Sequence, residues 1–468
     1  MLVALRLWMG SRLPYAAEDA LITFRYAANW AHGLGPVFNA GERVFGFTSP
    51  PWMAWVALSI RLGLDPLTWT RATSLLADAV TLIAFTSLLE RHASRAAAWC
   101  FAGFFATWPY LCALSTSGLE MDAVLALLAA SAWLSDRRHP AAGPALGLLA
   151  IFRPEGLVMA AVLAVWARGR DRIVAAVLVV AQALAMTVYY GSPIPQSLLA
   201  KAAVYGTPGP LHAQAWWDWT FPMALSGSLS SISEGANLFL LSLLLAPAAV
   251  MGARCLWTAR RSALAGAVAA AAAVWLGYLL TGTSYFFWYL ATPLLAWVLA
   301  ASVGMPQIVR SRLVYVALAL ALAGHWTYEQ RLYRARQDAE GGTFGPLGDY
   351  VAGVARPGEI ILLEPIGTIG WRCPRQRVLD EVGLVSPEVR TRRLRGAGWY
   401  TDLVAERRPA WLIGRAGTLL MGQGFAGVGA PFRSEAERLA ALAPYEMVAH
   451  TDTLGDQTKV LVVYRRRD

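Results

Sequence analysis

Two uninterrupted apolar runs, residues 172–189 and 262–280, constrain this chain more than any other feature of its sequence. Each approaches the roughly 20 residues that an α-helix needs to cross the hydrocarbon core of a bilayer. A helix of this length on a soluble domain would carry a polar stripe facing water, and neither run has one. Hydrophobic residues make up 57% of the chain and charged residues 15%. We therefore predict a polytopic membrane protein.

The charges divide the chain into two unequal parts. Residues 1–328 contain 20 Lys and Arg and 13 Asp and Glu, whereas the much shorter segment 329–468 contains 20 and 17. We predict an all-α membrane bundle over residues 1–328 and a soluble α/β domain over residues 329–468. The patterns in the soluble part predict strands at 359–364, 411–414 and 460–464 and an amphipathic helix at 433–443.

The apolar pattern predicts about eleven transmembrane helices. Their approximate positions are 2–13, 71–89, 95–113, 118–134, 141–152, 155–168, 172–190, 236–256, 263–281, 286–303 and 311–328. Two of these segments are too short to span the membrane. They flank Arg153-Pro154-Glu155-Gly156, which predicts a broken or shallow hairpin. The short apolar segment 51–63 is expected to lie along the outer surface or dip into it.

The first apolar segment, residues 2–13, is also shorter than a membrane span. We interpret it as a first transmembrane helix whose upstream end is missing, and a signal peptide is the alternative.

Basic residues in alternate loops predict the orientation of the bundle. Twelve arginines fall on one side, which the positive-inside rule makes cytoplasmic. The opposite side then receives the loop 14–50, the loop 191–235 and the whole C-terminal domain.

The net charge of +10 does not indicate nucleic-acid binding, because the bundle's arginines sit in short loops and acids nearly balance bases in the C-terminal part. Four scattered cysteines predict no disulfide framework, and the six histidines show no metal-ligand spacing.

Two adjacent acids, Glu18 and Asp19, follow the first apolar segment. Adjacent carboxylates repel, so one of them is suited to act as a general base. The alternative is structural, because acids are also favoured at a helix N-terminus.

The segment EDALITFRYAANWAHGLGPVFNAGERVFGFTSP, residues 18–50, resembles the first outer loop of bacterial GT-C glycosyltransferases of the arabinofuranosyltransferase type. That family commonly carries a pattern close to DDAYISFRYARNL…GLVFNPGERVEGYTN. Further short matches occur in the family's order over most of the chain. They are Ser117–Glu120, Arg153–Gly156, Tyr190–Lys201, Ile366–Trp371 and Val378–Leu384.

The resemblance implies an inverting transferase in the bacterial cytoplasmic membrane, with its C-terminal domain outside. The donor would be a polyprenyl-phosphate sugar, either arabinofuranose or a hexose such as mannose, and the acceptor an envelope glycan. By motif position the base would be Asp19, with Glu18 as the second candidate. Glu18 departs from the family's usual Asp, and Trp288 stands where the family often has Arg.

Cations on the outer side are candidates to bind the donor phosphate. Lys201 is one of only two lysines beside 38 arginines, and a rotatable ammonium suits a phosphate. Arg153 and Arg25 are the other two candidates. For Lys201 the structural alternative is a solvated loop residue, and for Arg153 it is an internal ion pair with Glu155.

Acceptor or sugar binding is predicted for Glu120, Asp122, Glu155 and Trp217. The alternatives are a helix N-terminus for the first two and an interfacial aromatic belt for Trp217. No metal ligands are assigned, although the acids of the outer side, with Asp19, have the oxygen chemistry that Mg²⁺ or Ca²⁺ binds. Asp78, within a span, is predicted to make a structural hydrogen bond inside the bundle.

Two other function classes compete with the transferase. One is a transporter or flippase of a lipid-linked or small polar substrate, although no duplicated half is visible. The other is a non-catalytic assembly partner that keeps the scaffold, which the departures at Glu18 and Trp288 keep open.

Overall fold

The structure is a computed structural model. It describes residues 1–12, 16–205, 232–260, 262–281, 283, 286–311, 313–320, 322, 324, 326, 334, 340–422, 429–451 and 460–467.

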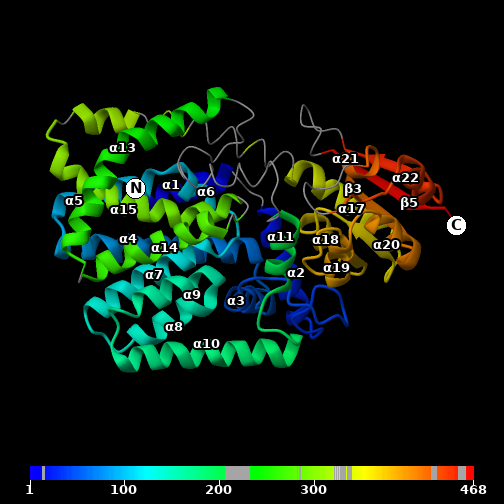
Figure 1. Cartoon of the computed structure of the whole chain (residues 1–468), viewed down its shortest axis with the longest axis horizontal. Helices are drawn as coiled ribbons and strands as arrows, with labels where there is room; N and C mark the ends of the chain where they lie inside the picture. Colours follow the sequence, from blue (N-terminus) through cyan, green and yellow to red (C-terminus); the bar gives the residue numbers. More distant parts are fainter. Residues whose placement is uncertain are drawn as a thin grey trace.

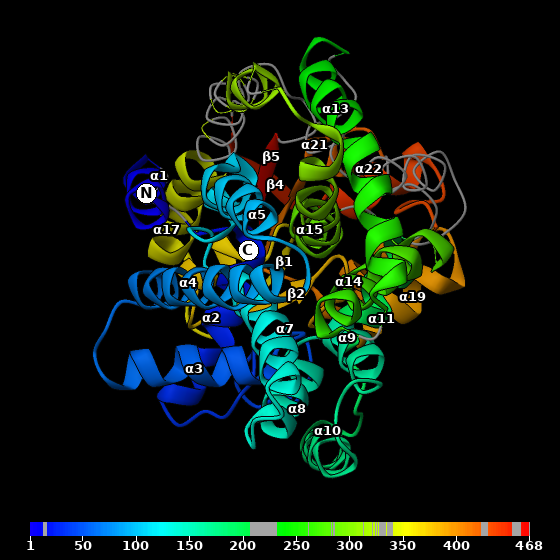
Figure 2. The same ribbon diagram turned by 90° about the vertical axis from the view of Figure 1, so that its left-hand side faces the viewer.

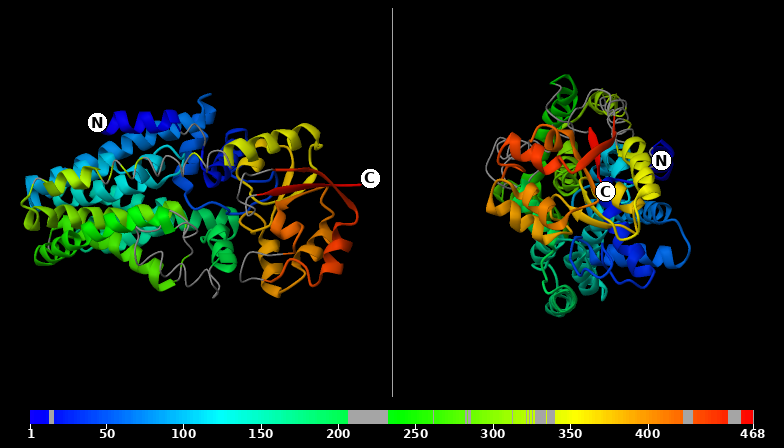
Figure 3. Two further views of the ribbon diagram at one scale, coloured as in Figure 1. Left: turned by 90° about the horizontal axis from the view of Figure 1, so that it is seen from above. Right: turned by 90° about the vertical axis from the view of Figure 1, so that its right-hand side faces the viewer.

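A helical bundle forms one end of the molecule and a smaller α/β domain the other (Figures 1 and 3). Helices α4 (Pro66–His92) and α10 (Gly169–Tyr190) run along the long axis of the molecule (Figure 1). The helices of the bundle region are α1 (Leu2–Arg12), α2 (Glu18–Ala31), α3 (Pro50–Arg61), α4 (Pro66–His92), α5 (Arg95–Thr107), α6 (Pro109–Leu114), α7 (Met121–Asp136), α8 (Ala142–Phe152), α9 (Pro154–Leu163), α10 (Gly169–Tyr190), α11 (Gln196–Tyr205), α13 (Ile232–Thr258), α14 (Ala263–Thr281), η1 (Phe287–Leu290) and α15 (Ala291–Ile308).

Within the described residues, four helices are long and apolar enough to cross a membrane: α4, α10, α14 and the continuous η1–α15. Helix α10 lies at the edge of the bundle (Figures 1 and 2), and its apolar side chains, such as Ile173 and Val188, face outward. Such an outward apolar surface suits contact with lipid. The predicted helical bundle, with apolar helices long enough to cross a membrane, is thus confirmed, but the count of eleven spans is not. The expected span 95–113, for instance, is two short helices.

The break between those two helices has a local cause. Helix α5 ends before Trp108 and α6 begins at Pro109. Proline fits the first position of a helix but cannot continue one, because it has no amide hydrogen to donate.

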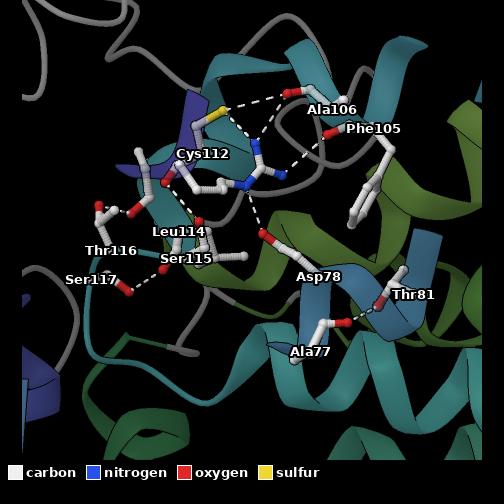
Figure 4. A network of polar contacts seen from close by, with 12 residues as sticks. Ala77, Asp78, Thr81, Phe105, Ala106, Cys112, Leu114, Ser115, Thr116 and Ser117 are labelled. Carbon is white, nitrogen blue, oxygen red and sulfur yellow. Dashed lines mark hydrogen bonds and ion pairs between the residues drawn. The ribbon is translucent and has the colours of Figure 1, made fainter. Parts of the chain in front are cut away.

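Helix α1 is held by a buried polar network (Figure 4). The Arg6 Nε donates to Asp78 Oδ2 on α4 at 2.6 Å, and Nη2 donates to the Phe105 carbonyl at 3.1 Å. Both side chains of this ion pair are almost completely buried. The structural role predicted for Asp78 is therefore confirmed, with Arg6 as its partner.

The predicted break at residue 153 is also confirmed. Helix α8 ends at Phe152, Arg153 is extended with φ −152° and ψ 158°, and α9 begins at Pro154. Helices α8 and α9 then pack tightly, since a Cβ on Gly156 would lie 2.0 Å from the Leu149 carbonyl oxygen. At this break the Arg153 side chain contacts Glu120, before α7, and Glu155, in the first turn of α9.

The C-terminal domain contains a five-stranded sheet with the order β2-β1-β3-β5-β4. Strands β2, β1 and β3 are parallel, and β5 and β4 run antiparallel to their neighbours. The domain's elements are η2 (Glu340–Phe344), α17 (Gly345–Val354), β1 (Ile360–Leu363), α18 (Thr368–Arg372), β2 (Arg377–Asp380), α19 (Pro387–Arg395), α20 (Trp399–Arg407), β3 (Trp411–Arg415), α21 (Ala416–Leu419), α22 (Glu435–Leu442), β4 (Tyr445–His450) and β5 (Leu461–Arg466). The predicted strands and amphipathic helix are confirmed, whereas β2 and β4 were not predicted. The division at residue 328 stays a prediction.

Helices α2 and α11 lie where the bundle meets the C-terminal domain (Figure 1). Gln196, at the start of α11, donates from Nε2 to the Gly383 carbonyl at 3.0 Å, and α18 packs against α2. The acidic pair, the break at residue 153 and the C-terminal domain therefore meet at one end of the bundle. The far end of α4 lies about 40 Å away, since that helix has 27 residues.

Candidate active site

Helix α2 begins at the junction between bundle and C-terminal domain. Ala17 is extended, and its amide donates to the Ser117 carbonyl at 2.8 Å, which fixes the start of the helix. Glu18 and Asp19 occupy the first helical turn, where exposed amides favour negative charge. The two carboxylates nevertheless point to different partners.

A pocket with an empty volume of about 480 Å³ opens beside Asp19. Its walls come from α2, the segment 46–48, the start of α7, the break between α8 and α9, α11, η1 and one residue of the C-terminal domain. The described residues that line it are Asp19, Ile22, Thr23, Gly46, Phe47, Thr48, Leu119, Glu120, Arg153, Ser197, Lys201, Trp288, Tyr289 and Leu384.

Asp19 and Lys201 form an ion pair in this pocket, with 2.7 Å between Oδ2 and Nζ. Both remain accessible, at 29% and 18% exposure of the side chain. Burial lowers the pKa of the Lys201 ammonium, but the facing Asp19 carboxylate outweighs this effect and leaves the pKa raised. Lys201 therefore stays charged at neutral pH.

Aromatic rings support the Lys201 ammonium from its other side. Nζ lies 4.4 Å from the ring centroid of Phe286 and 4.8 Å from that of Trp288. The negative faces of these rings attract a cation. Trp288 thus contributes to a cationic site by holding Lys201.

Arg153 projects from the broken hairpin and contacts two acids. It forms ion pairs with Glu120 and with Glu155, the latter at 2.8 Å between Nε and Oε1. The Tyr278 hydroxyl donates to the same Glu155 oxygen at 3.2 Å. The internal ion pair with Glu155 is therefore confirmed, and Arg153 and Glu120 also line the pocket, whereas Glu155 stands behind them.

Arg25 is not placed to bind a donor phosphate, which corrects that prediction. Its side chain is only 2% exposed, and the guanidinium donates to four carbonyls. These are the carbonyls of Phe38 at 2.8 Å, Gly370 at 2.5 Å, Cys373 at 3.1 Å and Gln376 at 2.9 Å. Its hydrogen-bonding capacity is consumed by contacts within the protein.

Asp122 is corrected as well. It is 1% exposed and is not among the described residues that line the pocket. It lies instead beside the buried pair of Arg6 and Asp78. Asp122 is two positions after Glu120, about half a helical turn, so its side chain faces another side of α7.

The Glu18 carboxylate faces the C-terminal domain rather than the pocket. It accepts hydrogen bonds from the Gly367 amide at 2.5 Å, the Thr368 amide at 2.8 Å and the Thr368 hydroxyl at 2.5 Å. Of the two candidate bases, only Asp19 lines the pocket.

Trp217 lies outside the described residues, and its predicted sugar contact stays a prediction. In the described part of the chain, no three His, Cys, Asp or Glu side chains gather as a metal site would require. The binding of Mg²⁺ or Ca²⁺ stays a prediction.

Several residues that line the pocket had not been predicted as site residues, among them Tyr289, Ser197 and Leu384. Tyr289 follows Trp288 and Ser197 lies four positions before Lys201, so their positions in the sequence could have indicated that they belong to the site. Leu384 comes from the C-terminal domain, and no local pattern indicates that it reaches the bundle.

The fold as a whole matches solved structures over nearly the full length of the chain. The structure of ArnT from Cupriavidus metallidurans in the apo state superposes with a TM-score of 0.59 at 12% identity, over 99% of this chain and 97% of that one. ArnT bound to undecaprenyl phosphate gives 0.54 at 13% identity over the same shares. The chain therefore has the GT-C fold, as its first loop predicted.

Curated relatives make the similarity more specific. The terminal β-(1→2)-arabinofuranosyltransferase of Mycobacterium tuberculosis is 31% identical over 229 residues, which are 42% of this chain and 36% of the relative. The enzyme of the same name from Corynebacterium glutamicum is 29% identical over 243 residues, 43% and 35% of the two chains. The match thus spans little more than a third of each relative. Residues 327–464 match a domain of unknown function, DUF8728.

Proposed function

We propose that this protein is an integral-membrane, inverting glycosyltransferase. It transfers a sugar from a polyprenyl-phosphate donor to an envelope glycan on the outer face of the bacterial cytoplasmic membrane. The observation that carries this proposal is the ion pair of Asp19 and Lys201 in a pocket at the junction of bundle and C-terminal domain.

Asp19 is the general base of the proposed reaction. An acceptor hydroxyl attacks the anomeric carbon, and its proton passes to the Asp19 carboxylate. The new glycosidic bond forms as the bond between the anomeric carbon and the phosphate oxygen breaks, and the phosphate departs with the electron pair. A positioned base of this kind contributes roughly 10²–10⁴ to the rate.

Lys201 and Arg153 supply the positive charge for the departing phosphate. Charge on the phosphate oxygens grows as the bond breaks, and fixed cations stabilise that charge. Lys201 is held by an acid on one side and rings on the other, so it is preorganised. Undecaprenyl phosphate, bound in an ArnT structure of the same fold, is a polyprenyl phosphate, the kind of leaving group that the proposed donor would release.

The relatives favour arabinofuranose as the sugar, and a hexose such as mannose is the alternative. The acceptor hydroxyls would contact Glu120 at the pocket wall. The proposed orientation places the pocket and the C-terminal domain outside the cytoplasm, consistent with the twelve arginines of the alternate loops.

Purified protein in liposomes, given radiolabelled polyprenyl-phosphate arabinofuranose or polyprenyl-phosphate mannose and a glycan acceptor, tests the proposal. We expect labelled glycan from one of the two donors. Movement of the lipid-linked sugar across the bilayer without transfer would support a flippase instead. Repeating the reaction with EDTA tests the predicted Mg²⁺ or Ca²⁺.

A further inference from the structure

Helix α18 of the C-terminal domain is held at both ends by side chains of α2. We propose that Glu18 and Arg25 form a charge clamp that seats this domain on α2, and that Glu18 is a positioning residue for Asp19 rather than a base. The catalytic part of this inference rests on the proposed function, whereas the clamp itself does not.

The anionic half of the clamp lies at the N-terminus of α18. The Glu18 carboxylate accepts hydrogen bonds from two successive amides, those of Gly367 and Thr368, and from the Thr368 hydroxyl. Amides at a helix start have no partner within the helix, and they carry partial positive charge. The backbones also approach closely, because a Cβ on Gly367 would lie 2.0 Å from the Glu18 carbonyl oxygen.

The cationic half lies at the C-terminus of the same helix. Arg25 donates to the carbonyls of Gly370 and Cys373, and to that of Gln376 just beyond. Carbonyls at a helix end lack partners and carry partial negative charge. The guanidinium is also fixed over Phe38, 4.3 Å from the ring centroid. Each end of α18 thus meets the charge that complements it.

Helical geometry lets two residues of α2 reach both ends of α18. Residues 18 and 25 are seven positions apart, about two turns, so they share one face of α2. Asp19 is rotated by about 100° from that face and points to Lys201 instead. Anchoring the Glu18 side therefore fixes the direction in which Asp19 projects.

A second contact holds the same domain through the edge of its sheet. Strand β2 is at the edge, and the Asn39 amide pairs with it as a neighbouring strand would. Asn39 Nδ2 donates to the Val378 carbonyl at 2.8 Å, and the Val378 amide donates to Asn39 Oδ1 at 3.0 Å. Glu42 adds an ion pair with Arg377. Four polar residues of the motif, Glu18, Arg25, Asn39 and Glu42, thus contact the C-terminal domain.

Hydrogen exchange with mass spectrometry, on the full-length protein in detergent, tests the clamp. In Glu18→Gln, which keeps the size but loses the charge and one acceptor, exchange in residues 367–369 should rise about tenfold or more. In Arg25→Lys, the rate of hydrogen exchange should rise in residues 371–376 instead. Strand β1, residues 360–363, should stay as protected as in wild type. Glu446→Gln, an exposed acid on β4, is the matched control.

Kinetics of the same variants test the positioning role. Glu18→Gln should lower kcat several-fold, leave the KM for the polyprenyl-phosphate sugar nearly unchanged and keep the acidic limb of the pH–rate profile. A loss of that limb would make Glu18 the base and overturn the positioning role. Exchange in Glu18→Gln equal to that in Glu446→Gln would overturn the clamp. Because exchange needs no turnover, it separates failure of the clamp from failure of the proposed function.

Discussion

At the scale of single residues, the pocket depends on how neighbouring carboxylates are partnered. Glu18 and Asp19 are adjacent in sequence, yet one faces backbone amides and the other an ammonium. Charge in the first turn of a helix is stabilised by the helix itself, so the chain tolerates both acids there. Only Asp19, which faces the partly exposed Lys201 ammonium rather than backbone amides, lines the pocket that a substrate would enter.

Lys201 should therefore control how well the donor phosphate is bound and released. Replacement by Gln removes the point charge, and we expect kcat/KM for the polyprenyl-phosphate sugar to fall by about 10²-fold or more, as for loss of a charged contact in the transition state. Lys201→Arg should retain more activity. Steady-state kinetics measure the effect, with Arg356→Gln at an exposed site as the control. Equal kcat/KM values for Lys201→Gln and this control would contradict the role.

A second residue-scale prediction concerns Glu381, a fully buried acid of the C-terminal domain. Burial, reinforced by nearby Glu364, raises the pKa of Glu381 to about 8. In the unfolded chain the pKa of the Glu381 carboxyl is about 4.3, the ordinary value for Glu. Between these pH values the folded domain holds more protons, so its stability falls as pH rises, by up to about 1.4 kcal/mol per pH unit.

Unfolding midpoints measured from pH 5 to pH 9 test this prediction. Glu381→Gln is neutral throughout and keeps the shape of the side chain, so its midpoint should fall less steeply over this range than that of wild type. Parallel curves for the two proteins would show that Glu381 is ionised in the fold.

At the scale of elements, the break between α8 and α9 aims Arg153 at the pocket. Pro154 starts α9 where α8 must end, and Gly156 allows the two helices to touch. The extended conformation of Arg153 directs its side chain between Glu120 and Glu155. The geometry of the cationic site therefore depends on a glycine that has no chemistry of its own.

Gly156→Ala should disturb both stability and binding. Its Cβ has no room beside the Leu149 carbonyl, so the helices must separate, at a cost of about 1–3 kcal/mol for overpacking. We expect a lower unfolding temperature in detergent and a higher KM for the donor. Gly169→Ala, at a glycine with nothing within 4 Å of its Cβ, is the control. An unchanged unfolding temperature in Gly156→Ala would argue against the tight contact.

At the scale of the whole molecule, the C-terminal domain is part of the site. Leu384 lines the pocket and residues 367–376 are held by α2. The two parts of the chain thus meet at the proposed active site. This arrangement gives the domain matched by DUF8728 a physical role.

The sequence predicted features with local causes and missed those with distant ones. Pro154 predicts the break after Arg153, and apolar runs predict β1, β3 and β5. Strand β2 has the sequence RVLD, which mixes charged and apolar residues and so gives no apolar run like that of β1. From the sequence, Arg25 is predicted to be a cation of the outer side. Its carbonyl partners lie about 350 positions further along the chain, so the sequence does not show that it is already bound. Contacts of that separation leave no periodic trace in one sequence.

The central claim is that Asp19 takes the acceptor proton in a glycosyl transfer. The most direct measurement is the single-turnover rate of sugar transfer from a polyprenyl-phosphate donor by Asp19→Asn. Asp402→Asn, the same change at an exposed pair in the C-terminal domain, is the matched control. The account predicts a rate roughly 10²–10⁴ lower for Asp19→Asn and an unchanged rate for Asp402→Asn. Transfer by Asp19→Asn at the wild-type rate would contradict it.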